Sequence, residues 1–324
     1  MAAETQRSTS NGMSSPTPGG SGGTVSSVGP SKDGQTGRSF VDTLSAMWNS
    51  RWMRRFRRDR MAVGGVIFVA LLIFVAVFAP WLAPYDPAEQ HIIYRLRGPS
   101  EMFRLGTDEF GRDVLSRLIY GSRASLVVGL ASVFLAGVLG TIIGGISGYL
   151  GGRVDQVISS ITNILMSFPS LLLGLMVVVA LGPGTTNVVI AVALSLLPNF
   201  IRLARGPVLA LRQKEFIQAC RAIGASETRI ILRHIIPNIL GPISVMSTLW
   251  IATAIRTEAS LSFLGLGVQP PTPSWGNMIR SGVNNILSNP WLAVFSGLAI
   301  TVTVLAFNVI GDGLRDALDP KQRP

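Results

Sequence analysis

The sequence is poor in charged residues, in cysteine and in histidine. Only 14% of its 324 residues are charged, against about 25% in ordinary soluble proteins. The single cysteine, Cys220, excludes an internal disulfide framework and an all-cysteine zinc site. The two histidines, His91 and His234, lie far apart and no HExxH motif occurs, which argues against a zinc hydrolase. With a mean hydropathy of +0.45, these absences argue against a soluble enzyme and against a disordered protein.

The sequence also lacks a nucleotide-binding P-loop. Its three lysines are Lys32, Lys214 and Lys321, and none of them follows a GxxxxG pattern. A GGSGG at residues 19–23 matches the GxSxG pattern of hydrolases, but it lies in a linker-like segment with no strand or helix expected around it. We therefore expect no catalytic residue, no metal site and no cofactor in this chain.

Long apolar runs make up most of the chain. Residues 61–83 form an uncharged run that is long enough to span a bilayer, which needs about 20 apolar residues. Five more candidates follow, at about 124–150, 157–181, 186–204, 235–255 and 291–310. The third is the least regular, because its first half is polar and Pro169 interrupts it. The sequence thus predicts an all-α integral membrane protein with six spans.

The formal net charge of +11 is concentrated in two segments. Residues 1–60 hold nine Lys and Arg against four acids, and residues 201–234 hold seven against two. By the positive-inside rule both segments belong in the cytoplasm, which also places both termini inside. Membrane topology therefore explains the basic charge better than nucleic-acid binding does.

Composition divides the chain into three parts. Residues 1–39 are mainly Ser, Thr, Gly and Pro, which predicts a disordered cytoplasmic tail and no signal peptide. Residues 40–60 carry apolar side chains on one helical face and six arginines on the rest, which predicts an amphipathic helix at the membrane interface. A solvated helix packed on a protein core is the alternative for that segment. Residues 61–324 form the six-span domain, with an external loop at 84–123 and a basic cytoplasmic loop at 205–234.

Four glycines recur at four-residue spacing in the second predicted span. They are Gly140, Gly144, Gly148 and Gly152, and this spacing places them on one helical face. Such a face lets a neighbouring helix approach closely, so we expect tight helix packing there.

The basic loop contains the most informative pattern. Its apolar spacing predicts a short amphipathic helix whose apolar side carries Phe216, Cys220 and Ile223, with Ala219 beside them. Gly224 interrupts this helix where a turn can take positive φ, and a second helical stretch follows from Ser226 towards Pro237. A helix–turn–helix at the membrane surface suits docking of a cytoplasmic partner. Cys220 fits the role of a small core residue of the helix better than a redox role.

This loop resembles the EAA loop of ABC-importer permeases. In that pattern EAA, three residues, Gly, nine residues and IxLP mark the coupling helices. Gln218, Ala219 and Cys220 stand at EAA, and Gln218 in place of Glu puts a salt bridge from the first position in doubt. His234 likewise departs from the terminal IxLP. The resemblance implies that the residues coupling this loop, here named the coupling loop, to an ATPase are Phe216, Gln218, Ala219, Cys220, Gly224, Ala225, His234 and Pro237.

The resemblance extends over about residues 40–320. Four further segments are similar to the C-type permeases of dipeptide/oligopeptide ABC importers: LGTDEFGRDVLSRLIYGSRASLVVGL (105–130), MSFPSLLLGLMVVVALGPG (166–184), EASLSFLGLGVQPPTPSWGNMI (258–279) and LAFNVIGDGLRDALDP (305–320). The resemblance implies a type I importer permease, without enzymatic activity, in the bacterial cytoplasmic membrane. Its implied partners are a homologous B-type permease, two ATPase subunits that bind ATP and Mg, and an extracytoplasmic peptide-binding protein.

The function implied by the resemblance is ATP-driven import of short peptides. Members of the same family that carry glutathione or nickel complexes leave the substrate open. A self-sufficient secondary transporter or channel would need ionisable residues in mid-span for ion coupling, and none is present there. A membrane scaffold without transport is the third interpretation, because glycine-rich packing alone would permit it.

Two ionisable residues stand at the outer end of the fifth predicted span. Arg256 and Glu258 lie in an otherwise apolar stretch, where ionisable side chains are candidates for function. Because a peptide carries both an ammonium and a carboxylate group, one residue of each sign suits a translocation path. Neutralisation of the two side chains by each other is the equally weighted alternative.

The predicted external segments offer candidates for docking the binding protein. Asp108 and Arg112, like Asp113 and Arg117, form acid-before-base pairs at i, i+4 on an expected helix that leads into the second span. These pairs either orient the helix or contact the binding protein.

A proline-rich external loop at 269–275 is the second docking candidate. Its three prolines stiffen the backbone, which suits Pro271 for a rigid docking surface. Trp275 either shares that surface or anchors the loop at the membrane interface.

Overall fold

The computed structural model describes residues 51–318 of the chain. The predicted tail at 1–39 and the first half of the predicted amphipathic helix at 40–60 lie outside the described residues. Within the described range all regular elements are helices, apart from an isolated β-bridge between Thr107 and Asp113. The helical fold predicted from hydropathy is confirmed.

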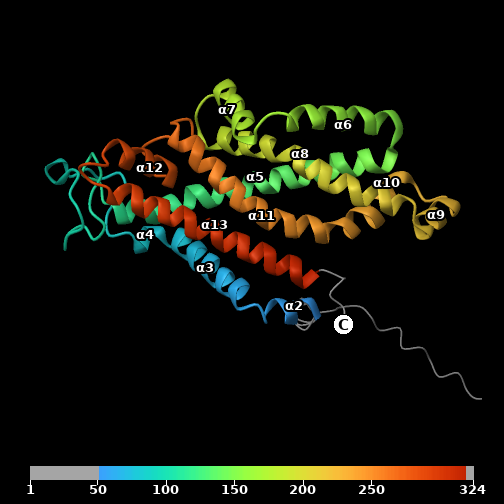
Figure 1. Cartoon of the computed structure of the whole chain (residues 1–324), viewed down its shortest axis with the longest axis horizontal. Coiled ribbons are helices and arrows are strands. Elements are labelled where there is room, and N and C mark those ends of the chain that lie inside the picture. The colour runs from blue at the N-terminus through green and yellow to red at the C-terminus, as the bar shows by residue number, and fades with distance from the viewer. Residues whose placement is uncertain (1–50, 319–324) are drawn as a thin grey trace, which may run out of the picture. The chain divides into compact units, whose positions relative to one another are not determined.

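The helices follow one another along the chain as labelled in Figure 1. In order they are α2 (Arg51–Phe56), α3 (Arg60–Val77), α4 (Ala79–Leu82), η1 (Ile92–Tyr94), α5 (Val114–Leu150), α6 (Gly152–Met166), α7 (Ser170–Leu181), α8 (Thr185–Arg212), α9 (Glu215–Ala222), α10 (Glu227–Ile230), η2 (Ile231–Ile235), α11 (Ile236–Phe263), α12 (Trp275–Asn284) and α13 (Trp291–Leu318). Here η1 is a 3₁₀-helix and η2 is a π-helix.

Five helical segments are long and apolar enough to span a membrane by themselves. They are α3, α5, α8, the continuous stretch Glu227–Phe263 and α13. The pair α6 and α7 passes the same test only when taken together, and the two helices are bent by 93°. Pro169 explains the break, because a proline disfavours helical backbone at the preceding residue and has no N–H to continue the helix.

The packing of α5 on α8 indicates that the bent pair crosses the membrane once. Along α5, Gly140, Gly144 and Gly148 meet successively later residues of α8, from Phe200 to Arg205. The two helices therefore run in the same direction, so the chain between them must return from one end of the spans to the other. Since α6 and α7 make that return, the fold has six crossings, as the sequence predicts, and the third is bent.

The predicted glycine stripe forms the contact between α5 and α8. A side chain at Gly140, Gly144 or Gly148 would overlap atoms of α8, so these glycines let the two backbones approach closely. Gly152 does not take part, because α5 ends at Leu150 and Gly152 begins α6 in open space with a φ of +56°. The packing prediction is confirmed for three of the four glycines.

Two aspartates set where the first two spans begin. Asp59 accepts hydrogen bonds from backbone N–H groups in the first turn of α3, and Asp113 does the same for α5. The cap at Asp59 also divides the predicted helix at 40–60. Within the described residues that segment forms α2, which ends at Phe56, before α3 starts.

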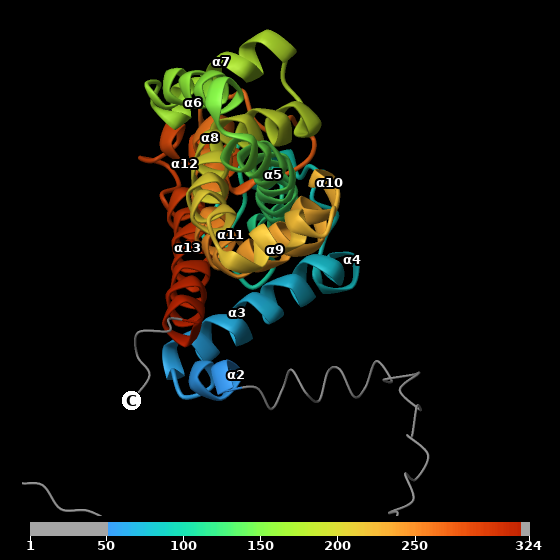
Figure 2. The same ribbon diagram turned by 90° about the vertical axis from the view of Figure 1, so that its right-hand side faces the viewer.

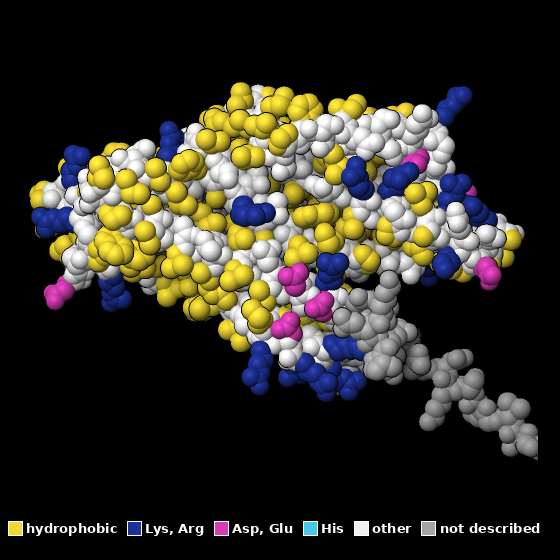
Figure 3. Space-filling view, viewed as in Figure 1, with side chains coloured by type: hydrophobic (Ala, Val, Ile, Leu, Met, Phe, Trp, Pro, Cys, Tyr) yellow, Lys and Arg dark blue, Asp and Glu magenta, His cyan; other side chains and the backbone are white. Residues whose placement is uncertain are grey.

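The helices pack in layers. α5, α8 and α11 lie between α3 and α13 on one side and α6 and α7 on the other (Figure 1; Figure 2). α9 and α10 lie at one end of the spans, whereas α12 and the segment 83–113 lie at the other (Figure 1). Apolar side chains cover much of the surface over the spans, and basic side chains gather near α2 and α9 (Figure 3). Exposed apolar side chains on α3, such as Ile67 and Leu71, suit contact with lipid.

Candidate functional site

The coupling loop is a helix–turn–helix at one end of the spans. α9 ends at Ala222, and the chain reverses through Gly224, whose φ is +78°. The Gly224 N–H donates to the Arg221 carbonyl at 2.9 Å. The Ala225 N–H donates to the Cys220 carbonyl at 3.0 Å. The predicted positive φ at this glycine is confirmed, and glycine adopts that conformation without the strain other residues incur.

The buried face of α9 is centred on Ile217 and only partly overlaps the apolar side seen in the sequence. Ile217 is fully buried, and Cys220 is half-buried against the main core. By contrast, Phe216 and Ile223 are exposed by 43% and 83%, and Ala219 is exposed as well. The expected core position of Cys220 therefore holds, whereas packing of Ile217 turns the neighbouring Phe216 outward. As a result, the loop presents two large apolar side chains at its surface.

The other residues matched to the EAA pattern lie on this surface or just behind it. Gln218 is exposed, and its Nε2 donates to the Gln213 carbonyl at 3.3 Å. Ala225 and His234 are half-buried, and Pro237 is exposed in the first turn of α11. Pro237 has no N–H and its ring crowds the preceding turn, so the chain passes through the π-helix η2 before it continues as α11.

A bidentate ion pair joins the base of the coupling loop to α6. Arg205 on α8 donates from Nε and Nη2 to the two carboxylate oxygens of Asp155, at 2.5 and 2.6 Å. Ser147 on α5 donates to the same carboxylate at 2.6 Å. Three helices thus meet at one carboxylate. Arg205 and Asp155 lie 50 residues apart in the sequence. The only sequence signal for this ion pair is that Asp155 is the single acid in the short link after the second span.

Arg221 ties α9 to the end of α5. Its Nε donates to the Tyr149 hydroxyl at 3.3 Å, and its guanidinium lies 5.1 Å from the centroid of the Tyr149 ring. The same Nε lies 3.9 Å from the Glu227 carboxylate at the start of α10. Because Tyr149 is buried, this contact links α9 to the packed end of α5.

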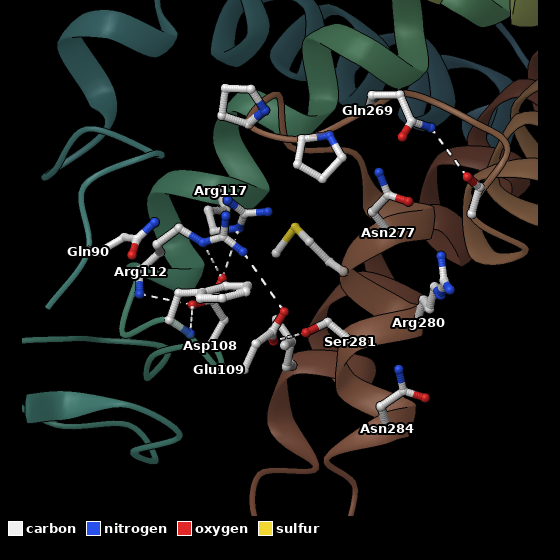
Figure 4. Close-up of a pocket in the computed structure, with 16 residues that line it drawn as sticks. Gln90, Asp108, Glu109, Arg112, Arg117, Gln269, Asn277, Arg280, Ser281 and Asn284 are labelled. Atoms are coloured by element: carbon white, nitrogen blue, oxygen red, sulfur yellow. Dashed lines mark hydrogen bonds and ion pairs between the residues drawn. The ribbon is translucent and has the colours of Figure 1, made fainter. Parts of the chain in front are cut away.

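At the other end of the spans, Asp108 is the centre of a buried cluster of charges (Figure 4). Its Oδ2 accepts a hydrogen bond from Arg112 Nε at 2.7 Å and lies 3.4 Å from Arg117 Nε. Its Oδ1 accepts the backbone N–H groups of Phe110 and Arg112, both at 2.9 Å. Asp108 therefore holds a turn and two guanidinium groups at once.

The predicted i, i+4 pairs are only partly present. Asp108 and Arg112 do pair, but in a turn, since α5 begins only at Val114. Asp113 caps α5 instead of pairing with Arg117, which turns to Asp108. Asp108 and Arg112 are exposed by only 1% and 8%, which leaves little of either side chain for a docking protein.

Glu109 connects this cluster to α12. Its carboxylate accepts a hydrogen bond from Ser281 Oγ and lies 3.9 Å from Arg112 Nη2 (Figure 4). Burial raises the pKa of Glu109 above its usual value, and the charge of Asp108 raises it as well. A backbone hydrogen bond and the charges of Arg112 and Arg117 act in the opposite direction.

Trp275 and Pro271 have different environments. Trp275 is exposed by only 2%, and its Nε1 donates to the Leu118 carbonyl of α5 at 3.0 Å. Both predicted surface roles are therefore wrong for Trp275, because its ring packs against α5 beside Gly121. Pro271 is exposed, and its role in docking stays a prediction.

Arg256 and Glu258 do not form a pair. Glu258 is fully buried between α5 and α11, where the hydroxyls of Ser125 (3.1 Å) and Ser262 (2.7 Å) donate to it. Arg256 is exposed on another face of α11, because residues two apart in a helix point about 200° from each other. The alternative of mutual neutralisation is therefore wrong, and a joint role in a translocation path stays a prediction.

The comparisons with known proteins agree with this fold. A family model described as "Binding-protein-dependent transport system inner membrane component" matches residues 140–324, and a model of the "N-terminal TM domain of oligopeptide transport permease C" matches residues 47–99. A solved structure of the MetNI methionine ABC transporter in an inward-facing conformation resembles the chain with a TM-score of 0.52 at 19% identity. It covers 63% of this chain and 97% of that one.

Curated relatives match nearly the whole chain. The "Glutathione transport system permease protein GsiD" of Escherichia coli O6:K15:H31 (strain 536 / UPEC) is 49% identical over 282 residues, which are 86% of this chain and 92% of the relative. The protein of the same name from Shigella boydii serotype 4 (strain Sb227) gives the same values. The chain is therefore a multi-pass membrane protein that belongs to the inner membrane components of binding-protein-dependent transport systems, as a C-type permease of the dipeptide/oligopeptide ABC importers.

Proposed function

We propose that this ABC-importer permease transports short peptides, and that glutathione, itself a tripeptide, is its substrate. The supporting observation is the 49% identity to proteins named glutathione transport permeases, which extends over 92% of their length. Other di- and oligopeptides are the second candidate. The match of residues 47–99 to the N-terminal domain of oligopeptide transport permease C favours them.

The proposed importer contains several further chains. A homologous B-type permease completes the channel, two ATPase subunits bind ATP with Mg, and an extracytoplasmic binding protein delivers the peptide. The absence of a P-loop from this sequence supports separate ATPase subunits, because that motif is the usual nucleotide-binding loop of an ATPase. This chain contributes the path and no catalytic residue.

The coupling loop is the proposed ATPase docking surface. Its exposed side chains Phe216 and Ile223 suit an apolar pocket on a partner protein, and they lie beside exposed polar residues. The excess of basic residues at this end supports a cytoplasmic location for the loop and for both termini.

In the proposed mechanism, closure of the ATPases displaces α9. The contact of Arg221 with Tyr149 passes this movement to α5, and the ion pair of Arg205 with Asp155 passes it from α8 to α6. The spans then alternate between inward-facing and outward-facing states, and peptide moves between the two permeases. Because both contacts join different helices, they make the spans move together.

Reconstitution of the complete importer in proteoliposomes tests this function. We expect ATP-dependent uptake of labelled glutathione that needs the binding protein, with an ATPase-inactive partner subunit as the control. Competition with unlabelled di- and tripeptides ranks the two substrate candidates. Uptake by this chain alone, without an ATPase subunit, would contradict the importer proposal. Saturable uptake of dipeptides without uptake of glutathione would select the second candidate.

A further inference from the structure

A cavity of about 560 Å³ lies between α12, the turn around Asp108 and the loop at 265–271 (Figure 4). Its size falls within the range of small-molecule sites, which is about 300–1,000 Å³. The buried charges of the Asp108 cluster lie on one side of it, and the polar side chains of α12 lie on the other (Figure 4). This cavity belongs to the end of the spans opposite the coupling loop.

Cationic groups are in excess around the cavity. Three arginines line it, against two carboxylates. Both oxygens of the Asp108 carboxylate already have two partners. Oδ2 pairs with Arg112 and Arg117, and Oδ1 accepts two backbone N–H groups. Arg117 Nε is buried and lies 3.4 Å from the shared Asp108 Oδ2, but it makes no hydrogen bond among the described residues. The carboxylates present therefore leave cationic hydrogen-bonding capacity unused.

Arg280 is the source of this excess. It projects from α12 into the lining of the cavity, next to Gly265. Its side chain makes no hydrogen bond or ion pair with any residue between 51 and 318, and it is exposed. An arginine that lines a concave site without an anionic partner is suited to bind an anion from solution, because its planar group matches a carboxylate.

Uncharged polar side chains complete the lining. Gln90 and Asn284 are exposed, and their amide groups make no hydrogen bond within the described range. An amide side chain can donate to and accept from a peptide group. The cavity therefore combines cationic groups for a carboxylate with amide groups for a peptide backbone.

We propose that this cavity is a binding site for a short anionic peptide, with Arg280 receiving a carboxylate of the ligand. The proposal rests on the proposed function, because that function makes a short peptide available at this surface. Glutathione fits the chemistry, since it has two carboxylates, one ammonium and two peptide bonds. The site receives the peptide at the permease surface, separately from the binding protein. A pocket of this size suits a small ligand such as this peptide better than it suits the surface of a docking protein.

Direct binding to the complete importer tests the proposal. The importer in lipid nanodiscs, with no binding protein and no ATP, is titrated calorimetrically with glutathione. We expect saturable binding that Arg280→Ala weakens about tenfold and Arg280→Lys weakens less, because a charged hydrogen bond is lost or reduced. Glutathione esterified at its glycine carboxylate provides the matched ligand, and we expect it to bind less tightly.

Arg104→Ala is the matched protein control. Arg104 is exposed in the segment 83–113, at the same end of the spans, and does not line the cavity, so this variant should bind glutathione like the wild type. Equal affinity of the wild type and Arg280→Ala would overturn the proposal.

Two further outcomes separate the cavity from the proposed function. An importer that takes up glutathione with its binding protein, yet binds none without it, overturns the cavity proposal and leaves the function standing. The cavity proposal is also overturned if Arg280→Ala abolishes ATPase stimulation by the binding protein while no direct binding of glutathione is measurable. In that case the cavity receives the binding protein. An importer that takes up no peptide at all overturns the function itself.

Discussion

The coupling loop and the Asp108 cluster lie at opposite ends of the same spans and are built in opposite ways. At the coupling loop, large apolar side chains such as Ile223 are exposed, and α9 is held by a few contacts, among them that of Arg221 with Tyr149. Around Asp108 the charged groups are mostly buried, and each oxygen of the Asp108 carboxylate has two partners. The first end therefore suits the proposed docking and movement, whereas the second end suits a fixed shape.

The largest expected effect comes from breaking the rigid end. Asp108→Ala leaves Arg112 and Arg117 buried without their shared carboxylate, and removal of one partner from a buried ion pair costs about 3–5 kcal/mol. We expect a clear fall in the thermal unfolding temperature of the protein in detergent. Glu101→Ala, at an exposed position of the same segment, is the control and should leave this temperature unchanged. An unaltered unfolding temperature for Asp108→Ala would mean that the cluster does not stabilise this end.

Two isoleucines of the coupling loop, one buried and one exposed, test whether its buried side stabilises α9 and its exposed side docks the ATPase. Ile217→Ala removes a fully buried side chain and should cost about 2–4 kcal/mol of local stability, seen as faster hydrogen exchange in α9. Ile223→Ala, at an exposed position, should leave exchange unchanged but reduce co-purification of the ATPase subunits. If Ile223→Ala has no effect on co-purification, the exposed apolar surface is not the docking site.

Gly224 tests whether the shape of the turn matters. Gly224→Val places a β-branched residue at a φ of +78°, which costs about 1–3 kcal/mol although no neighbour lies in the way. We expect weaker ATPase docking and less substrate-stimulated ATPase activity, with Gly224→Asn closer to the wild type because Asn tolerates positive φ. Gly64→Val, at an exposed position of α3 outside the coupling loop, is the matched substitution. Full activity of Gly224→Val would argue against this position as part of the docking turn.

The sequence predicted features that depend on local spacing. Hydropathy located the spans, and Pro169 marked the one that is bent. The positive φ at Gly224 and the packing of the glycines from Gly140 to Gly148 followed from residue type and spacing alone. These features are predictable because their cause lies within a few residues.

Features set by long-range packing were missed or misplaced. Phe216 and Ile217 are adjacent apolar residues, so a helix as short as α9 has two possible inward faces, and only its neighbours decide between them. The sequence around Trp275 is typical of a surface anchor, and only the packing of α5 against its ring shows that it is buried. The pairing of Asp155 with Arg205 joins residues 50 positions apart, so no local pattern could indicate it.

The smallest expected effect concerns how the rigid end responds to pH. Glu109 faces Asp108, Arg112 and Arg117 in the turn and Ser281 on α12, and burial raises the pKa of its carboxyl group. As pH falls from about 7.5 to about 5.5, Glu109 gains protons earlier than an ordinary glutamate, whereas the carboxylates of glutathione stay ionised. The cavity then becomes more positive, so glutathione should bind a few-fold more tightly at the lower pH.

Glu109→Gln isolates this effect. The variant removes the negative charge at every pH, so it should bind glutathione at neutral pH more tightly than the wild type does, with less change on acidification. Calorimetric titration of the nanodisc importer at the two pH values measures the difference. A pH dependence of the same size in Glu109→Gln and in the wild type would assign it to another group. Because glutamine keeps the size of the side chain and can still accept a hydrogen bond from Ser281, a change in affinity would report the charge of Glu109 and not its packing.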